Sequence, residues 1–208
     1  MKLVILGATG GTGMEIVRQA LERGHSVTAF VRSADRLKSL ADRITITQGN
    51  LLNCAELQDA IRGHDAVLSA FGPRLPIAKS DEDLLERFAA SLTCAMRNAG
   101  VRRAVVESTA FLFRDSIVPP TYLVGRLLFP GVVVDATAME RIFAASGVEW
   151  TMVRPPQLSD KPYTGKYRLR VGHLPPFGFS ISRADVADCM LKAVGDRSTI
   201  GKVLGPSY

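Results

Sequence analysis

Three glycines near the N-terminus have the types and spacing of a phosphate-binding turn. They stand in the string Gly7-Ala-Thr-Gly10-Gly-Thr-Gly13, between an apolar run and a helical pattern. Gly7 can take the positive φ of a tight turn, Gly10 lets the backbone approach a pyrophosphate, and Gly13 lets the helix pack closely on the strand. The amides of the helix's first turn then face the anion. The pattern predicts a dinucleotide-binding turn.

Two arginines after the second apolar run indicate which dinucleotide fits. Arg32 stands where an acidic residue would bind the ribose hydroxyl of NAD, and Arg36 follows one turn later. An arginine here accommodates the 2′-phosphate of NADP. A solvated arginine at a strand end is the alternative. We therefore expect NADP(H) as the cofactor, with NADPH binding better than NADH.

The elements that must position these residues alternate along the chain. Apolar runs predict strands at 3–6, 26–31, 44–47, 66–70, 104–106 and 149–154. Helical periodicity and capping signals predict helices after Gly13, from Asn53, from Ser80 with Asp83, at 135–146, and from Ser182 with Asp185. Residues 163–171 alternate like a strand, and residues 202–204 suggest a last one. This order predicts an α/β fold, a Rossmann-like doubly wound parallel sheet with helices on both faces.

We expect residues 1–208 to form a single domain with an irregular substrate-side wall at 156–181. The composition argues against some classes of protein.

The net charge is +6, but the chain has no run of Lys and Arg interleaved with aromatic residues that would indicate nucleic-acid binding. The apolar residues 117–134 contain three prolines and Arg126, so we expect no membrane span. Cys54, Cys94 and Cys189 show no metal-binding spacing and are expected to be buried, reduced thiols of a cytoplasmic protein.

Longer strings give a more specific match. The chain resembles the atypical short-chain dehydrogenases/reductases, and most closely their biliverdin-IXβ reductase/flavin reductase group. Beside the glycine string, the matching segments are Val31-Arg32, Phe71-Gly-Pro-Arg74, Ser108-Thr-Ala-Phe-Leu112, Val118-Pro-Pro120, Pro155-Pro-Gln157, Asp160-Lys-Pro-Tyr-Thr-Gly165 and Ile181-Ser-Arg-Ala-Asp185.

The resemblance implies a set of cofactor-binding residues along the whole cleft. Thr9, Gly10, Gly11 and Thr12 would hold the pyrophosphate, Arg32 and Arg36 the 2′-phosphate, and Asn50 with Leu51 the adenine. The remaining contacts would come from Phe71, Gly72, Arg74, Thr109, Pro155, Pro156 and Gln157. Four positions depart from the family's usual residues, namely Asn50, Thr109, Gln157 and Ala136, and a short insertion precedes Asp135. These departures concern the substrate more than the cofactor.

Hydroxyl groups supply the candidate catalytic residues, which are Ser108, Thr109 and Tyr122. The spacing of Thr109, Tyr122 and Arg126 resembles that of the Ser, Tyr and Lys of the wider superfamily. An exposed ion pair is worth under about 1 kcal/mol, too little to make Tyr122 an efficient acid near neutrality. We therefore expect Thr109 to orient the reactants as a hydrogen-bond donor, with no obligatory protein acid.

The resemblance implies an NADPH-dependent reductase that transfers hydride to a conjugated acceptor, such as a flavin, a linear tetrapyrrole or a quinone-like molecule. An anionic, aromatic acceptor would suit the basic residues between Arg154 and Arg170. A non-catalytic NADP-binding redox sensor is the alternative. A nucleotide-sugar epimerase is disfavoured because the chain has no Tyr-x-x-x-Lys. Residues 117–134 are expected to form either a lid or an oligomer contact, in a monomer or small homo-oligomer, with no metal site.

Overall fold

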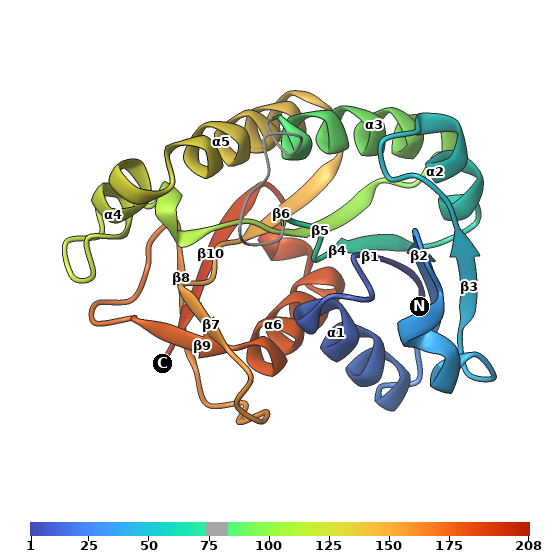
Figure 1. Cartoon of the computed structure of the whole chain (residues 1–208), viewed down its shortest axis with the longest axis horizontal. Helices are drawn as coiled ribbons and strands as arrows, with labels where there is room; N and C mark the ends of the chain where they lie inside the picture. Colours follow the sequence, from blue (N-terminus) through green and yellow to red (C-terminus); the bar gives the residue numbers. More distant parts are fainter. Residues whose placement is uncertain (74–82) are drawn as a thin grey trace.

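A computed structural model describes residues 1–73 and 83–208, and its helices lie on both faces of one sheet (Figure 1). The 8-stranded sheet has the order β3-β2-β1-β4-β5-β6-β10-β8, and β7 pairs with β9 apart from it. The strands are β1 Lys2–Leu6, β2 Ser26–Val31, β3 Thr45–Gln48, β4 Ala66–Ser69, β5 Arg103–Glu107, β6 Glu149–Val153, β7 Gln157–Ser159, β8 Arg168–Val171, β9 Ser180–Ser182 and β10 Lys202–Ser207.

The α-helices lie between successive strands along the chain, as expected for the crossover connections of a parallel sheet. In Figure 1, α1 and α6 cover one face, and α2, α3 and α5 cover the other. The helices are α1 Gly11–Glu22, α2 Cys54–Ile61, α3 Leu84–Ala99, α4 Thr121–Leu128, α5 Pro130–Ala145 and α6 Arg183–Gly195. The predicted doubly wound α/β fold is therefore confirmed.

Strand pairing puts the glycine turn at the switch point of the sheet. Strand β1 pairs in parallel with β2 on one side and with β4 on the other. Only β8 runs against its neighbour in the large sheet, pairing antiparallel with β10. The chain adds β2 and β3 on one side of β1 and then β4, β5 and β6 on the other, and this switch opens a crevice beyond the carboxyl ends of the strands.

Each face of the sheet has its own apolar core, which explains why the central strands read as continuous apolar runs. Leu3 and Ile5 of β1 face α1 and α6, while Val4 and Leu6 belong to the cluster with α2, α3 and α5. All four of these side chains are fully buried. Burial on both faces fixes the sheet rigidly beneath the crevice.

The N-terminus of α3 is capped from a distance rather than locally. The Asp135 carboxylate in α5 accepts hydrogen bonds from the backbone N–H groups of Leu85 and Glu86, both at 2.9 Å. The predicted cap by Ser80 and Asp83 is wrong for Asp83, whose side chain makes no capping bond, and Ser80 lies outside the described residues. A carboxylate from another helix serves equally well because it also complements the positive end of the helix.

Two predicted boundaries are wrong. Helix α5 begins at Pro130 rather than 135, because proline is well suited to the first helical position. The predicted strand 163–171 shortens to β8, Arg168–Val171, since only these residues pair with β10. The caps at Asn53 and Ser182 are confirmed.

The expectation of three reduced thiols is wrong for two of them. Cys54 and Cys94 form a disulfide between the start of α2 and the middle of α3, although 40 residues separate them. Their Cα atoms are 6.0 Å apart because α2 packs along α3. Cys189 is the buried free thiol, and burial raises its pKa to about 12.

Within residues 1–73 and 83–208, no single helix is long and apolar enough to cross a membrane. Helices α4 and α5 reach that length and hydropathy only as a pair, and the chain bends by 115° between them.

Candidate active site

A cleft of about 1090 Å³ opens beyond the carboxyl ends of β1, β2, β4 and β5. It is lined by most of the residues that sequence reasoning assigned to the cofactor. These are Gly7, Thr9, Gly10, Gly11, Thr12, Arg32, Arg36, Asn50, Leu51, Phe71, Gly72 and Thr109, together with Ser108. The lining omits Gly13, Pro155, Pro156, Gln157 and Tyr122, and Arg74 lies outside the described residues.

The glycine turn has the predicted geometry. Gly7 has a φ of 74°, and the Gly10 N–H donates to the Gly7 carbonyl oxygen at 2.9 Å. A Cβ atom at Gly13 would lie 2.1 Å from that same oxygen, so no other residue fits there. Gly13 thus acts by packing α1 against the turn rather than by lining the cleft. No described side chain caps α1, which leaves its first-turn amides available to an anion.

The two arginines after β2 differ in their contacts. Arg36 donates from Nη1 to the Thr9 carbonyl oxygen at 2.7 Å, which ties the segment after β2 to the glycine turn. Arg32 is exposed in the cleft and has no hydrogen bond or ion pair with the described residues. Arg32 therefore has all its guanidinium donors free of the described residues, whereas Arg36 has already committed one of its five.

Asp35, a carboxylate between the two arginines in the chain, was not considered by sequence reasoning. Asp35 also lines the cleft, where it accepts a hydrogen bond from Ser33 Oγ at 2.7 Å and pairs with Lys38 at 2.7 Å. Lys38, and then Ser33, lower the pKa of Asp35. The negative charge of Asp35 is thus directed to its own neighbours, and Arg32 stays unpaired within the part of the chain that the structure describes.

At the far side of the turn, Asn50 is held in place by the cap of α2. Its backbone N–H donates to Glu56 Oε2 at 2.7 Å, and its side-chain Oδ1 accepts from Leu52 N at 3.0 Å. Leu51 is buried at 5% exposure while still lining the cleft. This wall of the cleft is therefore preformed and partly apolar.

The two neighbouring hydroxyls after β5 have different hydrogen-bonding freedom. Ser108 Oγ donates to Glu140 Oε1 at 2.6 Å, and Glu140 is also paired with Arg154. Thr109 Oγ1 instead accepts from Phe111 N at 3.2 Å. Because each hydroxyl has one proton, Ser108 has already committed its proton, whereas Thr109 can donate into the cleft.

Sequence reasoning missed Glu107, the last residue of β5. Its Oε1 accepts a hydrogen bond from Thr12 Oγ1 at 3.4 Å, directly beneath the first turn of α1. Burial raises the pKa of Glu107 to about 7, against smaller opposing effects of Thr12 and of the Arg183 charge. A carboxyl group poised near neutrality thus borders the place where a diphosphate would lie. Glu107 could have been found from the sequence, because it is the last residue of a buried parallel strand and ligands bind beyond the ends of such strands.

Arg183 was also missed, although it stands in one of the matching strings. It is the first residue of α6, and its side chain lines the cleft above Gly11. A Cβ atom at Gly11 would lie 2.5 Å from Arg183 Cδ. Arg183 Nη1 also donates to Asp160 at 2.6 Å, which joins the glycine turn to the segment after β7.

The other basic residues expected around an acceptor lie elsewhere. The cleft lining contains none of Arg154, Lys161, Lys166, Arg168 and Arg170. Arg154 is committed to Glu140 and lies over the Phe113 ring at 5.0 Å. The basic residues that we expected around the acceptor therefore do not line the cleft. Arg183 is the basic residue from the C-terminal third of the chain that does.

Tyr122 lies on α4, outside the cleft lining. Arg114 lies over its ring at 5.4 Å from the centroid. The expectation that Tyr122 is not an obligatory acid stays a prediction. Likewise, α4 contributes no residue to the cleft, so its role as a lid remains a prediction.

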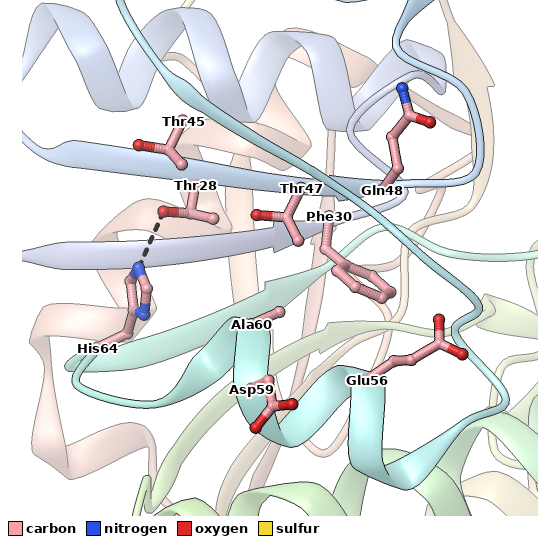
Figure 2. A pocket seen from close by; sticks show the side chains of 9 residues that line it. All are labelled: Thr28, Phe30, Thr45, Thr47, Gln48, Glu56, Asp59, Ala60 and His64. Carbon is pink, nitrogen blue, oxygen red and sulfur yellow. Dashed lines mark hydrogen bonds between the residues drawn. The ribbon is translucent and has the colours of Figure 1, made fainter.

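A second hollow of about 440 Å³ lies between the outer strands and α2 (Figure 2). Threonines of β2 and β3 line it, and Thr28 Oγ1 is 2.9 Å from His64 Nε2. It contains neither the glycine turn nor the arginines after β2. No group of three or more His, Cys, Asp or Glu that could hold a metal ion occurs in the described chain. The cleft at the switch point is therefore the candidate active site.

Comparisons with known proteins agree with this geometry. A family model described as NAD(P)H-binding matches residues 7–197. An uncharacterized chloroplastic protein of Arabidopsis thaliana is 30% identical over 98% of this chain and 75% of its own length.

Two solved structures cover all of this chain. An anaerobilin reductase from Escherichia coli O157:H7 is 20% identical with a TM-score of 0.80, covering 97% of that protein. A short-chain dehydrogenase/reductase from Veillonella parvula, solved with NADP, is 18% identical with a TM-score of 0.80, covering 94% of that protein. At these identities the two structures support the fold alone.

Proposed function

The chain belongs to the NAD(P)H-binding family, and on this premise we propose that it is an NADPH-dependent reductase that transfers hydride to a conjugated acceptor, with a flavin as the first candidate. The Rossmann-like fold and the family membership establish an NAD(P)H-binding oxidoreductase fold. The preference for NADPH and the identity of the acceptor are the new parts of the proposal.

The observation that supports the cofactor preference is Arg32, directly after β2, which has no ion pair or hydrogen bond with the residues that the structure describes. Arg36 has one donor bound to the Thr9 carbonyl oxygen, and Asp35 is bonded to Ser33 and Lys38, whereas Arg32 keeps all its donors free of the residues that the structure describes. A guanidinium group matches a phosphate in charge and in the spacing of its donors. The 2′-phosphate distinguishes NADPH from NADH, which makes Arg32 the discriminating residue.

The remaining residues fit the rest of a dinucleotide. Gly7, Gly10 and Gly11 line the cleft beside the first turn of α1, where a diphosphate would bind, and Arg183 adds a positive charge above Gly11. When bound, NADPH supplies the hydride. Thr109 would donate a hydrogen bond to orient the reacting groups, while Ser108 is held by Glu140. Pro155, Pro156 and Gln157 would contribute to cofactor binding only after a rearrangement of the segment beyond β6.

A spectrophotometric assay of NADPH oxidation tests the proposal. FMN, riboflavin, a soluble quinone and a linear tetrapyrrole are supplied as acceptors. The same assays are run with NADH in place of NADPH. We expect acceptor-dependent oxidation of NADPH that exceeds that of NADH. Thr109→Val should slow it and Thr109→Ser should retain it, since only serine keeps the donor.

Tight NADPH binding without oxidation in the presence of any acceptor would contradict the reductase and favour the redox sensor. Equal use of NADH and NADPH would contradict the role given to Arg32.

A further inference from the structure

One end of the molecule carries an apolar surface that the proposed function does not use. We define the end face as Ile117, Val118, Leu123, Leu127, Leu128 and Phe177. Ile117 is 83% exposed, Leu127 70% and Phe177 68%. In the described chain every exposed large apolar side chain except Met1 falls between residues 117 and 179. In Figure 1, α4 forms the end of the molecule opposite α2 and β3.

Two segments far apart in the sequence build this end face. Leu123, Leu127 and Leu128 recur at helical spacing on α4, so they project from one side of that helix. The loop with Phe177 joins them at Val118, whose carbonyl oxygen accepts a hydrogen bond from Phe177 N at 2.9 Å. The backbone hydrogen bond thus joins the Phe177 loop to the segment that leads into α4.

Phe177 is held in a conformation that a phenylalanine rarely adopts. Its φ is 58°, in the left-handed region, and its side chain is nonetheless directed to solvent. Such a conformation persists only where the surroundings enforce it, and it is enriched at functional surfaces. Here the ring stays exposed on a loop whose backbone is bonded to Val118.

The charges around the end face are mainly positive. From Ser116 to Val134 the chain has Arg126 and no acidic residue. Arg114, Arg126, Arg168 and Arg170 are all exposed, and none forms an ion pair with a carboxylate in the described ranges. Among the described residues, Arg168 donates to the main-chain oxygens of Pro176 and Tyr208. Asp115, the nearby acid, is bonded to His173.

We propose that the end face docks on the surface of an anionic lipid bilayer. Leucines and phenylalanine at the tip would enter the acyl boundary, and the arginines around them would meet the lipid phosphates. A second copy fits less well, because an isologous contact would place Arg126 and its neighbours against their own copies. A lid fits less well, because the cleft is lined by no residue of α4.

Vesicle co-sedimentation of the full chain tests the proposal. The probes are vesicles of phosphatidylcholine alone and of phosphatidylcholine mixed with phosphatidylglycerol. Binding to the mixed vesicles is expected to exceed binding to phosphatidylcholine and to fall as salt rises, because screening weakens the lipid–arginine attraction. Leu127→Asn with Leu128→Asn should reduce binding at least tenfold, and Arg126→Gln should reduce it for the anionic vesicles only.

Arg62→Gln is the matched control, since it removes the same charge at the end of α2 and should leave binding unchanged. All the altered side chains are exposed, so melting temperatures should stay at the wild-type value and verify folding. Absence of vesicle binding would overturn the proposal. Sedimentation velocity showing a dimer that the leucine variants disperse, without vesicle binding, would assign the end face to a second copy instead.

Discussion

The Arg183 side chain crosses over Gly11, with its Cδ 2.5 Å from the point where a Cβ of residue 11 would stand. This contact joins the first turn of α6 to the first turn of α1, and Asp160 holds the guanidinium from the other side at 2.6 Å. The residue that completes the glycine turn thus comes from the far end of the chain. In the proposed binding mode this charge would lie beside the diphosphate, a part that NADPH and NADH share.

Arg183→Gln is therefore expected to weaken NADPH and NADH by similar factors. A hydrogen bond to a charged group contributes about 1.5–3 kcal/mol, which corresponds to about 10- to 150-fold in the dissociation constant. Fluorescence titration of both cofactors measures the two factors, with Arg62→Gln as a control of equal charge. A loss confined to NADPH would place Arg183 at the 2′-phosphate and contradict this assignment.

Arg32→Ala, in contrast, should weaken the binding of NADPH and not that of NADH. Removal of the unpaired guanidinium is expected to weaken NADPH by about 10- to 150-fold and to leave NADH nearly unchanged, for the same energetic reason. The same titrations report it. Equal weakening of both cofactors would mean that Arg32 acts on the shape of the cleft rather than on the phosphate.

Glu107 should make the stability of the free protein depend on pH. Its pKa rises from 4.5 to about 7 on folding, so the folded state binds the extra proton between these values. Stability is then full below pH 4.5, decreases as pH rises to 7, and stays lowered above. Glu107→Gln, which keeps an acceptor for Thr12, should therefore stabilise the protein at pH 8 by up to roughly 3 kcal/mol and change little at pH 4.

Urea denaturation of the wild type and Glu107→Gln at the two pH values measures this difference. A gain of the same size at both would show that Gln improves packing rather than removing a titrating group.

Tyr122→Phe is expected to lower acceptor reduction by less than about tenfold, below the 10²-fold expected for loss of a general acid. The physical reason is its place on α4, with its ring against Arg114 and outside the cleft lining. Steady-state kinetics with unchanged NADPH affinity are the measurement. A loss of 10²-fold or more would restore Tyr122 as a proton donor.

The disulfide between Cys54 and Cys94 should stabilise the fold. It closes a loop with a sequence separation of 40, and a cross-link of this kind contributes about 2–4 kcal/mol by restricting the unfolded chain. Cys54→Ser should lower the free energy of unfolding by that amount, and a reductant should do the same to the wild type only. A reductant effect that persists in Cys54→Ser would locate the sensitive thiol elsewhere.

The cofactor half of the cleft was predictable because its signals are local in the sequence. Gly7, Gly10 and Gly13 act through backbone conformation and close approach, which only glycine permits, and Arg32 follows directly from the end of β2. Buried parallel strands read as apolar runs, so the doubly wound fold was equally accessible.

Tertiary structure alone decided the contacts between distant segments. Arg183 over Gly11, Asp135 at the start of α3, and Cys54 beside Cys94 each join elements that the sequence separates widely. Periodicity reports which face of a helix is buried, but not which neighbour supplies the charge or the sulfur that meets it. The sequence by itself thus determined the fold and the phosphate-binding turn, because both depend on short-range backbone chemistry. The packing of helices on the sheet decided which side chains complete the site.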